Sequence, residues 1–193
     1  MPVTVQAPNP PLSDGVVTLR PWGEDGDVEA LVAACNDRAI AEFLDIIPSP
    51  YTANDAREYI ERTREGWSAG TTSNFAILVD DKPVGSIGVS WKRPHEGVAE
   101  VGYWVAPEAR GKGVGTRALM LAARWALKER GMERLQLRAD ERNPASRRVA
   151  EKAGFTQEGI LRSSHYNPRL DRRIDFVMYS LLRDEVDCLR RAG

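Results

Sequence analysis

The sequence predicts a single domain of mixed α/β architecture, and three observations indicate it. The chain has 193 residues, close to the ~150 residues expected for one domain. Hydrophobic residues make up 42% of it and charged residues 28%, which is enough apolar surface for a core of its own. The expected elements are helices, then an antiparallel hairpin, then strand–helix–strand–helix–strand, an order typical of a sheet covered by helices.

The composition argues against several classes of protein. With 27 basic and 28 acidic residues the net charge is -1, which argues against a general nucleic-acid binder. No apolar run approaches the ~20 residues of a membrane span, and the amino terminus lacks the pattern of a signal peptide. Neither the two cysteines, Cys35 and Cys188, nor His95 and His165 have metal-ligand spacing. We therefore expect a cytoplasmic protein with no metal and no membrane partner.

The near-neutral charge is unevenly distributed along the chain. Residues 1–80 contain 5 basic and 13 acidic side chains, whereas residues 108–152 contain 12 basic and 6 acidic ones. One interpretation is that helices simply carry solvated charged faces. The other is an acidic region that faces a cationic substrate and a basic region that faces an anionic cofactor.

The ends of the chain are expected to lie outside the domain. Residues 1–14 contain four prolines and predict a flexible arm. Residues 186–193 are expected to form a polar carboxyl-terminal tail. The domain itself is therefore expected to span residues 15–185.

Local signals predict the elements of the first half of the domain. Apolar residues at helical spacing predict the first helix, and Thr52 with Asp55 is a capping signal for the second. Asp80-Asp81-Lys82-Pro83 is a turn sequence between two β-rich runs. In chain order we expect a strand at 16–20, a helix from 24 to about 44, a loop at 45–51, a helix at 52–69 and hairpin strands at 75–79 and 84–89.

The second half is predicted in the same way. Pro107 ends a β-rich run, an apolar stripe with helical spacing follows, and Gly131 is a typical residue after a helix. Asn143-Pro144 opens another helix, because asparagine caps and proline needs no amide hydrogen in the first turn. The expected elements are a strand at 98–105, a helix at 113–130, a short strand at 135–137, a helix from 143 to about 154, and strands at 155–161 and 174–181.

A basic, glycine-rich turn connects the strand that ends at Val105 to the long helix. The first turn of a helix has unpaired backbone N–H groups and a partial positive charge. Glycines let an anion approach these groups without interference from a Cβ atom. We expect a phosphate or pyrophosphate site formed by Arg110, Gly111, Lys112, Gly113, Val114, Gly115 and Thr116.

Two common nucleotide loops do not fit this turn. A Walker loop needs Ser or Thr directly after its lysine, but Gly113 follows Lys112. The dinucleotide fingerprint needs a third glycine where Thr116 stands, and an acidic residue ~20 positions further on.

The segment Arg110-x-x-Gly113-x-Gly115 resembles the Arg/Gln-x-x-Gly-x-Gly/Ala signature of the GNAT N-acetyltransferases. A second block, from Asn143 to Gly154-Phe155, is similar to the later helix of that family. The start of the domain, Val17-Thr-Leu-Arg20-Pro, and its end, Arg172-Arg173-Ile-Asp175-Phe, resemble the RimJ/RimL-type ribosomal-protein acetyltransferases. The resemblance covers residues 16–185. It implies the GNAT fold, with a twisted, mixed and mostly antiparallel sheet of about six or seven strands flanked by helices.

The same resemblance implies roles for particular residues. Acetyl-CoA, or another acyl-CoA, would bind through its pyrophosphate to Arg110–Thr116. The backbone of Trp104 and Val105 would pair with the pantetheine, and Asn143 would hydrogen-bond near the cofactor besides capping its helix. Phe43, Trp91 and Tyr166 would line the acceptor cleft.

The catalytic residues implied are a base and an acid. Glu100 would act as the base, unless it faces solvent or pairs with Lys92 or Arg93. The family's usual tyrosine acid is missing, because Ala150 stands at its position. Ser146 is the expected substitute, with Tyr166 as another possible donor.

The function expected from this resemblance is transfer of an acetyl group to a primary amine by direct attack in a ternary complex. The acceptor would be a protein amino terminus, an amino acid, an antibiotic or a polyamine, and dimers are common in the family. Alternatives are a non-catalytic CoA-binding module, an acyltransferase that uses succinyl-CoA, or a dinucleotide oxidoreductase.

Overall fold

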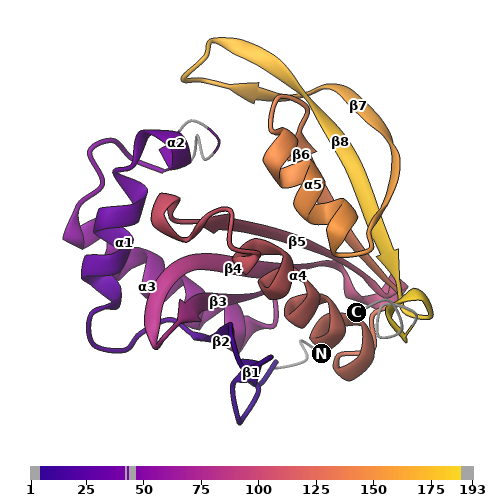
Figure 1. Cartoon of the computed structure of the whole chain (residues 1–193), viewed down its shortest axis with the longest axis horizontal. Coiled ribbons are helices and arrows are strands. Elements are labelled where there is room, and N and C mark those ends of the chain that lie inside the picture. Colours follow the sequence, from indigo (N-terminus) through magenta and orange to yellow (C-terminus); the bar gives the residue numbers. More distant parts are fainter. Residues whose placement is uncertain (1–4, 42, 44–46, 188–193) are drawn as a thin grey trace.

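A computed structural model describes residues 5–41, 43 and 47–187. They form one sheet with the strand order β1-β2-β3-β4-β5-β6-β8-β7 (Figure 1). All neighbouring strands are antiparallel except β5 and β6. The predicted fold class is confirmed, although the described residues contain eight strands rather than six or seven. In these residues no helix has the length and apolar character that crossing a membrane requires.

The boundaries of the elements follow the expected order. The strands are β1 Leu12–Ser13, β2 Thr18–Pro21, β3 Thr72–Val79, β4 Lys82–Arg93, β5 Val98–Val105, β6 Arg134–Asp140, β7 Thr156–Asn167 and β8 Arg172–Leu182. The α-helices are α1 Asp27–Cys35, α2 Arg38–Ala41, α3 Ala53–Ala69, α4 Val114–Arg124 and α5 Pro144–Lys152. Helix α4 continues as a π-helical turn, Trp125–Glu129.

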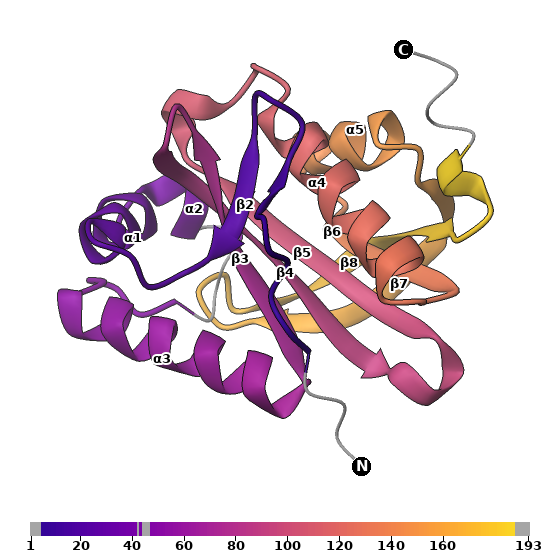
Figure 2. The same ribbon diagram turned by 90° about the horizontal axis from the view of Figure 1, so that it is seen from below.

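The helices cover the two faces of the sheet (Figure 2). Helices α1 and α3 pack with Ala76 and Leu78 in a smaller apolar cluster. Helix α4 packs with Val101 and Val105 in the larger one. Since alternate residues of a strand point to opposite faces, β5 contributes to both: Trp104 packs against the smaller cluster.

Strands β5 and β6 are joined over a short distance only. Their register pairs are Val98 with Arg134, Ala99 with Leu135 and Glu100 with Gln136. Beyond these, β5 remains paired with β4 as far as Val105, and β6 with β8 as far as Asp140. The two strands therefore separate after Glu100, and Figure 1 shows the two parts of the sheet diverging there.

Residues near both ends of the described chain pack on the domain, although the sequence suggests a flexible arm over residues 1–14 and a polar tail over residues 186–193. Val5 and Val186 are buried in the larger apolar cluster, and Leu12–Ser13 pairs with β2. Asp14 forms a 2.8 Å ion pair with Arg117 on α4. Apolar contacts and strand pairing thus hold residues 5–14 and 186 on the domain.

The helix expected from Glu24 to about Leu44 is interrupted. Helix α1 ends at Cys35, and the short α2 begins at Arg38. The Asn36 side chain explains the break: its amide donates to the carbonyls of Val32 and Tyr51, and its oxygen accepts from the Tyr51 N–H. Residue 44 lies outside the described residues.

A buried ion pair fixes α1 to the sheet. Asp27 is fully buried and accepts two 2.9 Å hydrogen bonds from Arg20 on β2, as well as bonds from the N–H groups of Gly23 and Glu24. Burial raises the pKa of Asp27, but these hydrogen bonds outweigh it and lower the pKa overall. The stabilisation by the ionised carboxylate is therefore complete above the unfolded pKa of ~3.9 and is lost as the pH falls through the folded value.

We expect Asp27→Asn to lower the free energy of unfolding by about 3 kcal/mol, because it removes the buried partner of Arg20 and leaves only the exposed Glu24, at 3.1 Å, as counter-charge. Denaturant titration at neutral pH measures the change. Asp25→Asn is the matched control, since Asp25 is exposed on the same turn. A loss below about 1 kcal/mol for Asp27→Asn would contradict a stabilising role for this pair.

Candidate active site

The glycine-rich turn leads from β5 into α4 in a conformation that depends on glycine. Gly111 and Gly113 have φ values of 74° and 79°, in the left-handed region that other residues adopt at a cost. An added Cβ at either position would meet no heavy atom within 4 Å. The backbone conformation, together with open space in front of the turn, therefore accounts for these two glycines.

The start of α4 is open to an anion. Gly113 is the N-cap of α4, and no side chain caps the helix there. The first intrahelical bond runs from the Arg117 N–H to the Gly113 carbonyl, so the N–H groups of Val114, Gly115 and Thr116 have no acceptor within the helix. The exposed Lys112 adds positive charge, and a phosphate group matches these donors.

The other residues expected at the cofactor site have defined places. Arg110 Nε donates a 2.9 Å hydrogen bond to the Val105 carbonyl, which ties the turn to the end of β5. The Val114 side chain is buried in the core, so only its backbone is available. An added Cβ at Gly115 would lie 3.4 Å from the Tyr103 ring and 3.6 Å from Val105 and Val149, which leaves little room for a larger side chain.

Glu100 occupies the last register position at which β5 and β6 are joined. Its Oε1 accepts a 2.8 Å hydrogen bond from Arg138 Nη2 on β6. The Glu100 side chain is 20% exposed and that of Arg138 is 39% exposed, so the ion pair is partly accessible to solvent. Its partner is Arg138 rather than Lys92 or Arg93, and Arg138 also lies 5.5 Å from the centre of the Phe176 ring.

Ser146 lies in the first turn of α5, opposite β5. Its backbone N–H donates to Asn143 Oδ1 at 3.0 Å, so Asn143 caps α5 as the sequence predicts. The Tyr103 hydroxyl donates to Ser146 Oγ at 3.3 Å. Ala150 is fully buried and supplies no polar group. Ser146 and Tyr103 thus place two hydroxyls at the first turn of α5.

The three residues expected in the acceptor cleft differ in their surroundings. Trp91 is buried beside Trp125 in the core, and its indole N–H donates to Ser73. Phe43 is exposed. Tyr166 is also exposed, on β7, and its hydroxyl donates to Asp171.

Sequence reasoning missed Tyr103 and Arg138. Strand alternation was the available signal for both. Tyr103 shares a face with Val101 and Val105, which pack towards α4. Gln136 on β6 is the register partner of Glu100. Arg138 is two positions after Gln136, so its side chain lies on the same face of β6 as that of Gln136.

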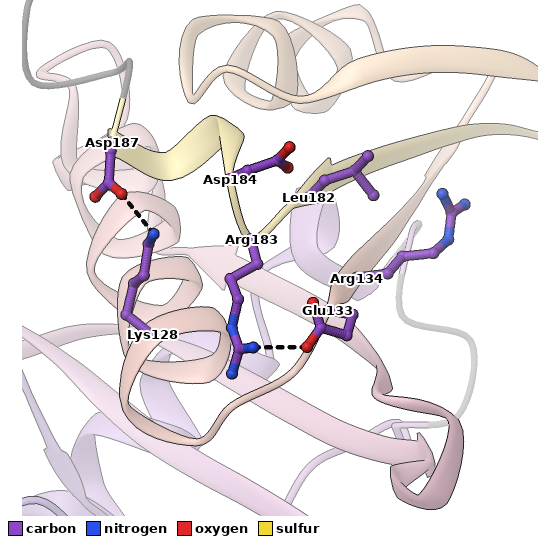
Figure 3. Close-up of a pocket in the computed structure, with 7 residues that line it drawn as sticks. All are labelled: Lys128, Glu133, Arg134, Leu182, Arg183, Asp184 and Asp187. Atoms are coloured by element: carbon purple, nitrogen blue, oxygen red, sulfur yellow. Dashed lines mark hydrogen bonds and ion pairs between the residues drawn. The ribbon is translucent and has the colours of Figure 1, made fainter.

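A surface hollow of about 610 Å³ lies beyond the carboxyl-terminal end of α4, the end opposite the glycine-rich turn (Figure 3). Its charged side chains are largely paired with one another, as in Lys128 with Asp187 and Arg183 with Glu133, both at 2.6 Å. The described residues that line this hollow include no glycine and no helix start like that of α4. In the part of the chain that the structure describes, no group of three or more His, Cys, Asp or Glu side chains could hold a metal.

The fold and the site together are those expected of an acyltransferase, with an uncapped helix start beside a strand that carries a carboxylate. Residues 17–156 match the family described as the acetyltransferase (GNAT) domain. The chain belongs to this family of acetyltransferases.

Named relatives agree with this classification. The chain is 27% identical over 172 residues to "Uncharacterized N-acetyltransferase p20" of Bacillus licheniformis, covering 88% of this chain and 94% of that protein. It is 26% identical over 112 residues to the ribosomal-protein-serine acetyltransferase of Escherichia coli, covering 58% of this chain and 63% of that one. The structure of Mycobacterium smegmatis RimJ in complex with CoA-disulfide has the same fold, with a TM-score of 0.77, 22% identity, and coverage of 93% and 90%.

Proposed function

We propose that the protein transfers the acetyl group of acetyl-CoA to a primary amine by direct attack in a ternary complex, in the cytoplasm. One observation carries the proposal. The uncapped start of α4, the carboxylate of Glu100 and the hydroxyl of Ser146 all border the part of β5 that has no partner on its β6 side. An anion site, a base and a hydroxyl donor are the groups that this transfer requires.

Glu100 is proposed to accept the proton of the attacking amine, directly or through a water molecule. Its Oε1 is held by Arg138, while no hydrogen bond to Oε2 is seen among the described residues. Oε2 is therefore available to the acceptor, and Arg138 fixes the direction in which it points.

Ser146 is proposed to protonate the leaving sulfur. The C–N bond forms as the C–S bond breaks, the amine proton passes to Glu100, and the hydroxyl proton of Ser146 passes to the thiolate. The products are an amide and free CoA; Glu100 then releases its proton to solvent, and Ser146 is reprotonated from solvent. No covalent enzyme intermediate is needed.

A protein amino terminus is one proposed acceptor, supported by a relative that is named as a ribosomal-protein-serine acetyltransferase, whereas another relative is named as a mycothiol acetyltransferase. Amino acids, aminoglycosides and polyamines are the other primary amines to compare. The acidic residues of the first half, 13 against 5 basic ones up to residue 80, favour a cationic acceptor.

A thiol-release assay tests the proposal, with a panel of peptides, amino acids, aminoglycosides and polyamines and with acetyl-CoA and succinyl-CoA as donors. We expect CoA release that depends on one class of amine and is faster with acetyl-CoA. Thermal stabilisation by CoA without turnover on any amine would favour a non-catalytic CoA-binding module instead. Failure to bind either acyl-CoA would contradict both.

A further inference from the structure

Tyr103 connects three elements of the site. It lies on β5, where that strand has lost its β6 partner. Its hydroxyl is 3.3 Å from Ser146 Oγ on α5. Its ring lies 3.4 Å from the Cβ position of Gly115, in the first turn of α4. The ring therefore occupies the space between the proposed anion site and the proposed acid.

The hydrogen bonds around Ser146 determine where its own proton can go. Ser146 Oγ accepts from the Tyr103 hydroxyl, and the Ser146 backbone N–H is taken by Asn143 Oδ1. A serine hydroxyl has a single hydrogen, and no hydrogen bond donated by it is seen in the described residues. With Tyr103 on one side of the oxygen, that hydrogen is directed away from the phenol.

The phenol is suited to act as a donor that keeps its proton. Burial raises the pKa of Tyr103. Tyr103 is therefore neutral at physiological pH and remains available to donate to Ser146.

We infer that Tyr103 is a positioning residue for the acid step: by donating to Ser146 Oγ, it turns the Ser146 proton towards the sulfur of the acyl-CoA. This rests on the proposed function. Tyr103 itself keeps its proton throughout, so the proton that reaches the sulfur is that of Ser146, and solvent replaces it after the amide and CoA have formed.

Tyr103→Phe tests the inference, because it removes the hydroxyl and keeps the ring against α4. We expect kcat to fall about tenfold, the scale of one oriented hydrogen bond, while the Kd of CoA and the KM of acetyl-CoA stay within twofold. Tyr59→Phe is the matched control. It also removes a tyrosine hydroxyl that contacts a serine, Ser86, at 3.1 Å, but on the α3 side, and it should leave kcat unchanged.

A double-mutant cycle separates positioning from packing. In a Ser146→Ala background, Tyr103→Phe should cause no further loss of kcat, because the hydroxyl that it orients is absent. An equal tenfold loss in that background, or a loss expressed only in CoA affinity, would overturn the inference.

If the wild-type protein releases no thiol with any amine, the proposed function fails and the inference fails with it. If the wild type is active but the losses of kcat from Tyr103→Phe and Ser146→Ala add, the proposed function stands and only the role of Tyr103 is overturned.

Discussion

Glu100→Gln is expected to lower kcat by about 10²–10⁴ at neutral pH, the usual contribution of a general base. Glutamine has nearly the same shape but cannot accept the amine proton. Arg138 would lose a charged partner, but both side chains are partly exposed, so the free energy of unfolding should fall by less than about 1 kcal/mol. A steady-state thiol-release assay, with CoA affinity measured separately, separates the catalytic from the binding effect.

Glu96→Gln is the control for this change. Glu96 is also a carboxylate in an exposed ion pair, with Arg93, but it precedes β5 and lies outside the separated region. It should change kcat by less than twofold. Equal turnover of Glu100→Gln and the wild type with a good acceptor would remove Glu100 from the mechanism.

Gly113→Val is expected to weaken CoA binding by about 100-fold. Valine disfavours the left-handed conformation of the N-cap, so the turn must change and the N–H groups of the first turn of α4 would no longer converge on one phosphate. Loss of even one charge-assisted hydrogen bond costs about 1.5–3 kcal/mol. Isothermal titration of CoA against the folded variant measures the loss.

The chain supplies a matched control for this backbone change. Gly26 is the N-cap of α1, with φ of 87°, no side-chain cap and no heavy atom within 4 Å of an added Cβ. Gly26→Val should therefore cost similar stability, about 1–3 kcal/mol, but leave the Kd of CoA unchanged. If both variants lose CoA binding equally, global destabilisation explains the loss and the anion site is not at Gly113.

The sequence predicted those parts of the fold and site that depend on local signals. Thr52 and Asp55 form the expected capping box of α3, and the glycine-rich turn precedes α4 as its spacing indicates. The break after Cys35 was not predictable in this way, because it depends on Asn36 contacting Tyr51, fifteen residues further along the chain.

The side chains of the site show the same division. Gly113 and Asn143 act on their own helices, so a short stretch of sequence identifies them. Tyr103 acts on Ser146 and Arg138 on Glu100, across 43 and 38 residues. The surroundings of Trp91 were not predictable for a related reason: an aromatic residue on a strand can face the core or a cleft, and here its contacts are with Trp125 and Ser73.

The separation of β5 from β6 also affects how the backbone exchanges hydrogen with solvent. Among the described residues, β5 from Val101 to Val105 has a partner strand on its β4 side only, so amides directed towards β6 have no acceptor in a described strand. A ligand that inserts along this edge would supply acceptors as a third strand does, and would protect these amides. The amides directed towards β4 are already in a ladder and would change little. Amide hydrogen exchange, measured at alternate residues of β5 with and without the ligand, would then show how far along the strand the ligand binds.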